Sequence, residues 1–224
     1  RTVAQLVGYE VPMLLNVLPV IMLSGSMSLF DIIAKQTDAP GGFGLPFILF
    51  LPVSALVFLI SGIAEVGRSP FDLMEAESEI VAGFHVEYSG MKFALFMMGE
   101  YVNAAVVSIM FSTFFLGGFA GPIFIPPYVW FLAKAFSIFF IFMWLRGTLP
   151  RLRVDQLMNL AWKFLLPLVL LNVVAAALWH YTAGWAFPGA GLVRWLLCGG
   201  LVAGPYVLLG RALFAGKQLG PRIY

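Results

Sequence analysis

Apolar, sparsely charged segments recur along this chain, and several are as long as the roughly 20 residues that a helix needs to cross a membrane. Of all residues, 61% are hydrophobic and 11% are charged, whereas a soluble domain carries about 25% charged residues. We therefore predict an all-α polytopic membrane protein whose residues 1–224 form a single membrane domain. About six spanning helices are expected, at residues 3–29, 45–64, 91–116, 128–146, 156–181 and 192–214.

The first of these segments is longer than a membrane requires and contains Pro12 and Pro19. Proline has no N–H group, so Pro12 frees the carbonyl of Gly8, next to Glu10. We predict a kink at Pro12. A polar link rich in glycine and proline, at residues 31–44, is expected to follow.

The distribution of basic residues predicts the orientation. The links that would share one side of the membrane with both chain ends hold most of the lysines and arginines, whereas the other side holds Lys35 and Arg194. Because basic links stay on the cytoplasmic side, both ends and the acidic loop at residues 65–90 are expected there. The basic residues on this side are Arg1, Arg68, Lys92, Arg146, Arg151, Arg153, Arg211, Lys217 and Arg222.

Acidic residues are concentrated in one stretch. Residues 65–101 hold seven of the eleven carboxylates, and apolar residues such as Phe71 are interleaved among them. Asp72 and Glu75 have the spacing of a capping box, which predicts a short helix on which Glu75 and Glu79 repel each other. If that helix is partly buried, its protons leave in coupled steps. The alternative is a solvated acidic loop with no chemical role.

Four charged residues are expected within or at the ends of spanning helices. Glu100 lies nine residues into the third helix, about 14 Å along its axis, where an acid is by default a functional candidate. A structural hydrogen bond is the alternative for Glu100, and a position within reach of water is the alternative for Glu10. Lys163 could reach the cytoplasmic side, whereas Lys134 is expected to face an acid or water.

Several kinds of site are excluded. The single cysteine, Cys198, cannot hold an iron–sulfur cluster or a cysteine-ligated zinc ion. His85 and His180 lack metal-ligand spacing, and no glycine-rich phosphate loop for NADH follows a strand pattern. We expect neither a metal nor a cofactor in this chain. The start at Arg1 without methionine suggests a fragment.

Two segments carry a family resemblance. The stretch AEVGRSPFDLMEAESEIVAGFHVEYSGMKFALFMMGEY resembles the signature region of the H subunit (ND1-type) of respiratory complex I, the proton-pumping NADH:quinone oxidoreductase, with Met74 where that family usually has proline. LPRLRVDQLMNLAWKFLLP is similar to the same subunit, with Val154 in place of the usual tyrosine. The resemblance covers residues 1–185, and the family's N-terminal region, which forms much of the quinone entry, has no counterpart here.

The resemblance implies roles for particular residues. A proton relay would comprise Glu10, Glu65, Asp72, Glu75, Glu77, Glu79 and Glu100. The quinone cavity or the interface with the peripheral arm would comprise Arg68, Phe71, Arg146, Arg151, Arg153 and Asp155. Lys134 and Lys163 match intramembrane lysines of the family. The alternative for the arginine cluster is anchoring of helix ends at lipid phosphates.

The resemblance also implies partners and a location. Ubiquinone or menaquinone would be the substrate, and FMN and iron–sulfur clusters would belong to partner subunits. Those partners are a peripheral-arm iron–sulfur subunit, small membrane subunits and antiporter-like subunits in a bacterial plasma (inner) membrane, with no nucleic acid. The isolated chain would catalyse nothing. The alternatives are a subunit of an ion-pumping hydrogenase, a free-standing ion transporter and a structural anchor; the transported ion, H⁺ or Na⁺, stays open.

Overall fold

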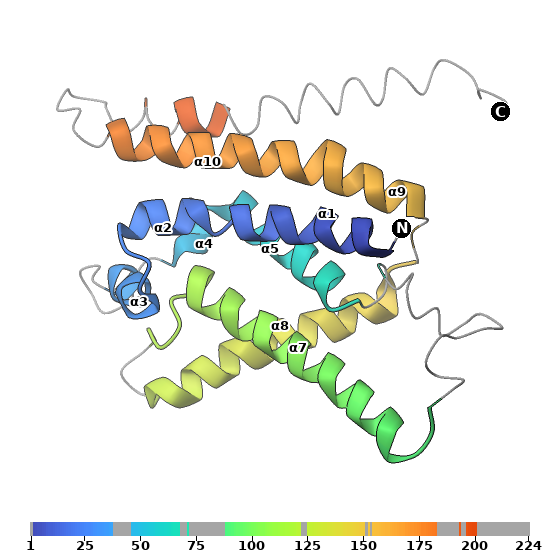
Figure 1. Ribbon diagram of the computed structural model, residues 1–224. Helices are drawn as coiled ribbons and strands as arrows, with labels where there is room; N and C mark the ends of the chain where they lie inside the picture. Colours follow the sequence, from blue (N-terminus) through green and yellow to red (C-terminus); the bar gives the residue numbers. More distant parts are fainter. Residues whose placement is uncertain are drawn as a thin grey trace, which may run out of the picture.

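The computed structural model is helical throughout, and no strand occurs in the part of the chain that it describes (Figure 1). It describes residues 2–37, 46–67, 71, 88–121, 125–150, 152, 154–182, 193 and 196–200, the side chains of 2–6, 154 and 155 excepted. The predicted all-α fold is confirmed. The elements are α1 (Thr2–Leu15), α2 (Leu18–Ser24), α3 (Leu29–Thr37), α4 (Phe47–Phe50), α5 (Pro52–Glu65), α7 (Met91–Phe115), α8 (Pro127–Thr148), α9 (Val154–Asn159), the π-helix η1 (Leu160–Leu165) and α10 (Leu166–Tyr181).

The first apolar segment is interrupted near its middle. Helix α1 continues through Pro12, where we expected a kink, and the interruption comes later, at Asn16 and Val17. Pro19 stands in the first turn of α2 and cannot donate to the carbonyl of Leu15. The N–H of Val17 donates to the carbonyl oxygen of Leu14 at 3.1 Å, three residues back and not four as in an α-helix. The helix then resumes as α2, which ends at Gly25 in the left-handed conformation.

A helix, α3, occupies much of the predicted polar link at residues 31–44, so that expectation was wrong for Asp31 to Thr37. Ile32 and Gln36 lie one turn apart and are both buried. The Gln36 amide nitrogen lies 3.2 Å from the carbonyl oxygen of Thr113, and its oxygen accepts from the N–H of Phe47 at 3.2 Å. The helix is therefore stabilised by contacts with α7 and α4 that are distant in the sequence.

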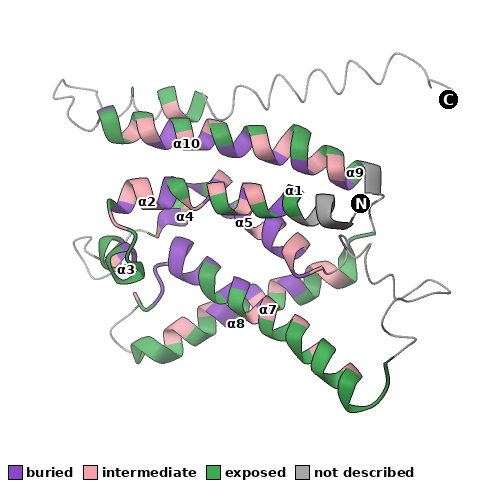
Figure 2. Cartoon of the chain, in the orientation of Figure 1, coloured by how far each residue is buried: buried purple, intermediate pink, exposed green. Residues whose placement is uncertain are grey.

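Helices α7 and α8 cross each other as an X on one side of the bundle (Figure 1). At the inner end of α7, the ring of Phe58 on α5 packs against Phe111, Phe114 and Phe115. A β-carbon on Gly62 of α5 would lie 2.6 Å from Cγ1 of Val107, which shows how closely α5 and α7 approach. Away from the crossing, α8 and the amino-terminal part of α7 are mostly exposed, whereas the carboxyl end of α7 is buried (Figure 2).

Within the described residues, four helical segments are long and apolar enough to cross a membrane: Val7–Ser24, Met91–Phe115, Pro127–Thr148 and Gln156–Tyr181. Helix α5 is apolar but shorter, and α4 precedes it with a break at Leu51. Of the sixth predicted span, only Val193 and residues 196–200 are described, and they are helical. The number of six spans stays a prediction.

Candidate functional site

The structure describes about half of the residues that the sequence singled out. Glu10, Glu65, Glu100, Phe71, Arg146, Lys134 and Lys163 are described. The other predicted site residues lie outside the described part of the chain, except that the backbone of Asp155 is described. These are Arg68, Asp72, Glu75, Glu77, Glu79, Arg151, Arg153 and the side chain of Asp155.

Two acids meet where α1 packs against α5. Glu65 is the last residue of α5, just beyond the predicted span at 45–64, and its carboxylate interacts electrostatically with that of Glu10 on α1. Its Oε2 atom is shielded from solvent and accepts no hydrogen bond from the described residues. Burial raises the pKa of Glu65, and the nearby Glu10 carboxylate raises this pKa further. Glu65 therefore retains its proton more readily than a glutamate in water.

The start of the acidic loop is attached to the same place. Phe71 is buried and meets the ring of Tyr9 edge to face, with 5.4 Å between ring centroids. The Tyr9 hydroxyl donates to the carbonyl oxygen of Leu157 on α9 at 2.9 Å. Tyr9 precedes Glu10, so these contacts attach Phe71 to the helix that carries Glu10. The sequence analysis missed Tyr9, although a tyrosine beside an acid in an apolar helix was a usable signal.

Glu100 lies on α7, and both of its carboxylate oxygens are shielded from solvent. Asn103, nearly one turn further along α7, directs its amide nitrogen at the carbonyl oxygen of Glu65, 3.5 Å away, which is long for a hydrogen bond. Residues three apart share a helix face. Helix α7 therefore carries Glu100 near the end of α5 at which Glu65 lies.

Lys134 is held by backbone carbonyls, where we expected an acid or water. Its ammonium group donates to the carbonyl oxygens of Leu116 at 2.6 Å, Gly118 at 3.1 Å and Ala120 at 2.6 Å. These oxygens follow the end of α7, where a cation also complements the helix dipole. The geometry favours a structural role for Lys134, at the end of α7 opposite to Glu100. Lys163 in η1 is exposed, in keeping with a side chain that reaches the membrane surface.

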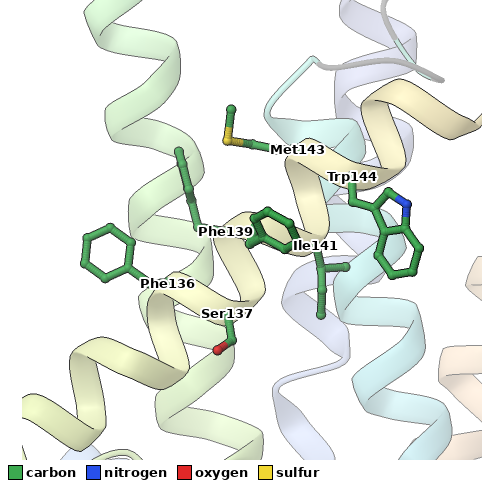
Figure 3. A pocket seen from close by; sticks show the side chains of 7 residues that line it. Phe136, Ser137, Phe139, Ile141, Met143 and Trp144 are labelled. Carbon is green, nitrogen blue, oxygen red and sulfur yellow. The ribbon is translucent and has the colours of Figure 1, made fainter.

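The remaining described features offer no catalytic group. Arg146 is half-buried in the last turn of α8, the helix end expected at the cytoplasmic face. Among the described residues, no three His, Cys, Asp or Glu side chains form a metal-ligand group. An open apolar groove runs along α8, lined by Phe136, Ser137, Phe139, Phe140, Ile141, Met143 and Trp144 (Figure 3). Its one hydroxyl, that of Ser137, donates to the carbonyl of Ala133, so the groove suits acyl chains or a protein surface.

Known proteins are similar to this chain over most of its length. A family model described as NADH dehydrogenase matches residues 1–177. The second H subunit of NADH-quinone oxidoreductase from Geobacter sulfurreducens is 54% identical over 174 residues, which are 78% of this chain and 51% of that protein. The H subunit from Dehalococcoides mccartyi is 51% identical over 177 residues, 79% of this chain and 48% of that protein. The chain spans about half the length of the curated relatives it matches.

Proposed function

Since the chain belongs to the NADH dehydrogenase family, as do the H subunits of NADH-quinone oxidoreductase, we propose that it serves as a membrane subunit of a proton-pumping NADH:quinone oxidoreductase. In this role it forms part of the quinone cavity and of the acidic path that couples quinone reduction to proton translocation. The observation that carries the proposal is the Glu10–Glu65 pair between α1 and α5, in which Oε2 of Glu65 is shielded from solvent.

The chemistry assigned to the cavity is reduction of a quinone to a quinol. Two electrons arrive from an iron–sulfur cluster of a partner subunit, and two protons are taken up at the quinone oxygens. The negative charge that forms before protonation acts over a long range, because a poorly hydrated cavity screens it weakly. Acids of the loop, at Asp72, Glu75, Glu77 and Glu79, respond by taking up or releasing protons. FMN and the clusters belong to partner subunits.

Glu65, Glu10 and Glu100 then pass the change in protonation into the membrane. Glu65 is suited to this step because its neighbour Glu10 and its burial both favour the protonated form. A second electrostatic change nearby can therefore release or recapture the proton. The antiporter-like subunits of the assembly receive this signal. The bacterial plasma membrane is the proposed location, with the acidic loop on the cytoplasmic side.

The test replaces Glu65, Glu77 or Glu100 with glutamine in the assembled complex and measures NADH:quinone turnover and proton pumping. A side chain that cannot ionise should slow turnover about tenfold, a barrier increase of about 1.4 kcal/mol. The matched control is Asp31→Asn, since Asp31 is an exposed carboxylate on α3 that accepts from the Ser26 hydroxyl at 2.6 Å. Unchanged turnover and pumping in all three glutamine variants would exclude the relay.

A further inference from the structure

The interruption of the first spanning segment contains a fully buried amide. Asn16 lies between α1 and α2, near the middle of the segment Val7–Ser24, and its exposed fraction is 0%. A polar group at this depth cannot exchange hydrogen bonds with bulk water, and lipid chains offer none. Its hydrogen bonds must therefore be made inside the protein.

The amide nitrogen of Asn16 takes part in a group of hydrogen bonds that joins three segments. We call this group, formed by Asn16, Ser54 and Asn172, the node. It donates to the backbone carbonyl of Ser54 on α5, while the amide of Asn172 on α10 donates to the Ser54 hydroxyl oxygen. Ser54 and Asn172 are also buried. Because a backbone carbonyl only accepts hydrogen bonds, it determines which end of the Asn16 amide faces it.

The amide oxygen of Asn16 therefore points away from Ser54, and no described residue donates to it. A buried acceptor left without a donor is destabilising. A second acceptor lies at the same interruption, because Pro19 cannot donate to the carbonyl of Leu15. Two adjacent residues thus present acceptors in the middle of a membrane-spanning segment.

Another buried amide of this chain shows the contrast. Gln36 has an exposed fraction of 1%, and its nitrogen lies within 3.3 Å of the carbonyl oxygens of Ile32, Thr113 and Phe114. Its oxygen accepts from the N–H of Phe47 at 3.2 Å. The fold therefore supplies a donor for the oxygen of one buried amide and none, among the described residues, for that of the other.

Two more buried polar atoms without a hydrogen-bond partner among the described residues lie along α5. Ser61 has an exposed fraction of 0%, and neither its hydroxyl nor Oε2 of Glu65 has a hydrogen-bond partner among the described residues. Ser54, Ser61 and Glu65 lie within roughly 40° of one another around the helix axis. They form a row about 16 Å long on one face of α5, from the node to the Glu10–Glu65 pair.

We propose that an internal water molecule binds at Asn16 and donates a hydrogen bond to its amide oxygen, in the interruption between α1 and α2. Internal water typically fills such sites with two to four hydrogen bonds. A hard metal cation fits poorly, because it needs about six or more oxygen ligands and prefers carboxylates, which the node lacks. This site does not depend on quinone chemistry; where the relay proposed above operates, water here and at Ser61 extends it along α5.

The test is a density map of the assembled complex, in lipid nanodiscs, at a resolution that shows ordered water. The parent protein should show a water peak within hydrogen-bond distance of Oδ1 of Asn16 and none at Oε1 of Gln36, which serves as the internal control. Asn16→Asp keeps an acceptor and should keep the peak, with its protonated oxygen donating to Ser54. Asn16→Leu should lose the peak.

Two results would overturn the proposal. One is a parent map with no peak at Oδ1 of Asn16, and the other is a protein group donating to that oxygen. Both are read from the parent protein, so they decide the question even where Asn16→Leu fails to assemble. A normal turnover of quinone in these samples leaves the water assignment intact, and a failed relay test does not remove the peak. The two proposals are therefore tested separately.

Discussion

Glu65 shows how its neighbours decide what an acid does. Its position at the end of α5 removes water from one carboxylate oxygen, and the approach of α1 places Glu10 close enough to repel a second negative charge. Both effects favour the protonated form. An isolated glutamate in a solvated loop would experience neither. The chemical role of Glu65 therefore depends on the packing of α1 against α5.

Removing the charge of Glu10 should make Glu65 easier to ionise. Glu10 raises the pKa of Glu65, so in Glu10→Gln this pKa should fall and the Glu65 proton should leave at a lower pH than in the parent. The measurement is a pH titration of the protonated-carboxyl band in infrared spectra of the assembled complex. Glu10→Asp, which keeps the charge, is the control. A titration that is identical in Glu10→Gln and the parent would contradict the coupling.

Lys134 should stabilise the fold by holding the segment that follows α7. Lys134→Met removes an ammonium group that donates to the carbonyls of Leu116, Gly118 and Ala120. Loss of charged hydrogen bonds of this kind should lower the free energy of unfolding by about 3 kcal/mol. Chemical denaturation in detergent measures this. Lys163→Met removes the same charge at an exposed position and should change it by less than about 0.5 kcal/mol. Equal effects of the two substitutions would disprove the structural role.

Among the helices, interruptions at proline are the recurring feature. Pro19, Pro52 and Pro167 each stand in the first turn of a helix that continues an earlier one. A membrane protein tolerates the carbonyls freed in this way where neighbouring helices, side chains or ordered water supply other donors. The continuous helices α7 and α8, by contrast, are the least buried of the four candidate spans in the described part of the chain. The interrupted candidate spans, Val7–Ser24 and Gln156–Tyr181, are thus more buried than the continuous ones.

The contact between α5 and α7 should be sensitive to one methyl group. In Gly62→Ala, the new β-carbon would meet Cγ1 of Val107 at 2.6 Å, with the ring of Phe142 at 3.8 Å. Such overpacking should destabilise the fold by about 1–3 kcal/mol. Gly99→Ala on α7 meets nothing within 4 Å and should stabilise by up to about 1 kcal/mol, as alanine does in helices. Thermal unfolding of both variants measures the difference, and a neutral Gly62→Ala would refute the close approach.

In the molecule as a whole, the helix ends are sorted between two sides. The amino ends of α1, α7 and α9 and the carboxyl ends of α5 and α8 lie on the right in Figure 1, whereas α3 and the carboxyl ends of α7 and α10 lie on the left. Glu65, the last residue of α5, therefore lies at the right side. The distribution of basic residues predicts that this side faces the cytoplasm.

Labelling of single cysteines should report this orientation. In a background without the native cysteine (Cys198→Ser), Ser89→Cys precedes α7 and Phe119→Cys follows it, and both positions are exposed. An impermeant thiol reagent added to intact cells should label Phe119→Cys, whereas Ser89→Cys should react only after permeabilisation. The reverse pattern would invert the topology and place the acidic loop outside.

Hydrophobic run length and charge spacing determined the helical class, the position of α7 and α8, and the concentration of acids before α7. These are local properties, since a segment of about 20 apolar residues is stable in a membrane only as a helix, whatever its neighbours. The resemblance of residues 65–101 to one family pointed correctly to the family that the comparisons show.

Tertiary structure alone decided which polar groups meet. Helix α3 forms within a segment that we expected to be a polar link. It forms there because the Gln36 amide makes hydrogen bonds with residues on α4 and α7. Lys134 finds carbonyls in place of an acid, and Asn16 lies in a break that comes four residues after Pro12. These outcomes depend on donors and acceptors far apart in the chain. The local sequence does not indicate which donor pairs with which acceptor, because these pairs form only when the helices pack.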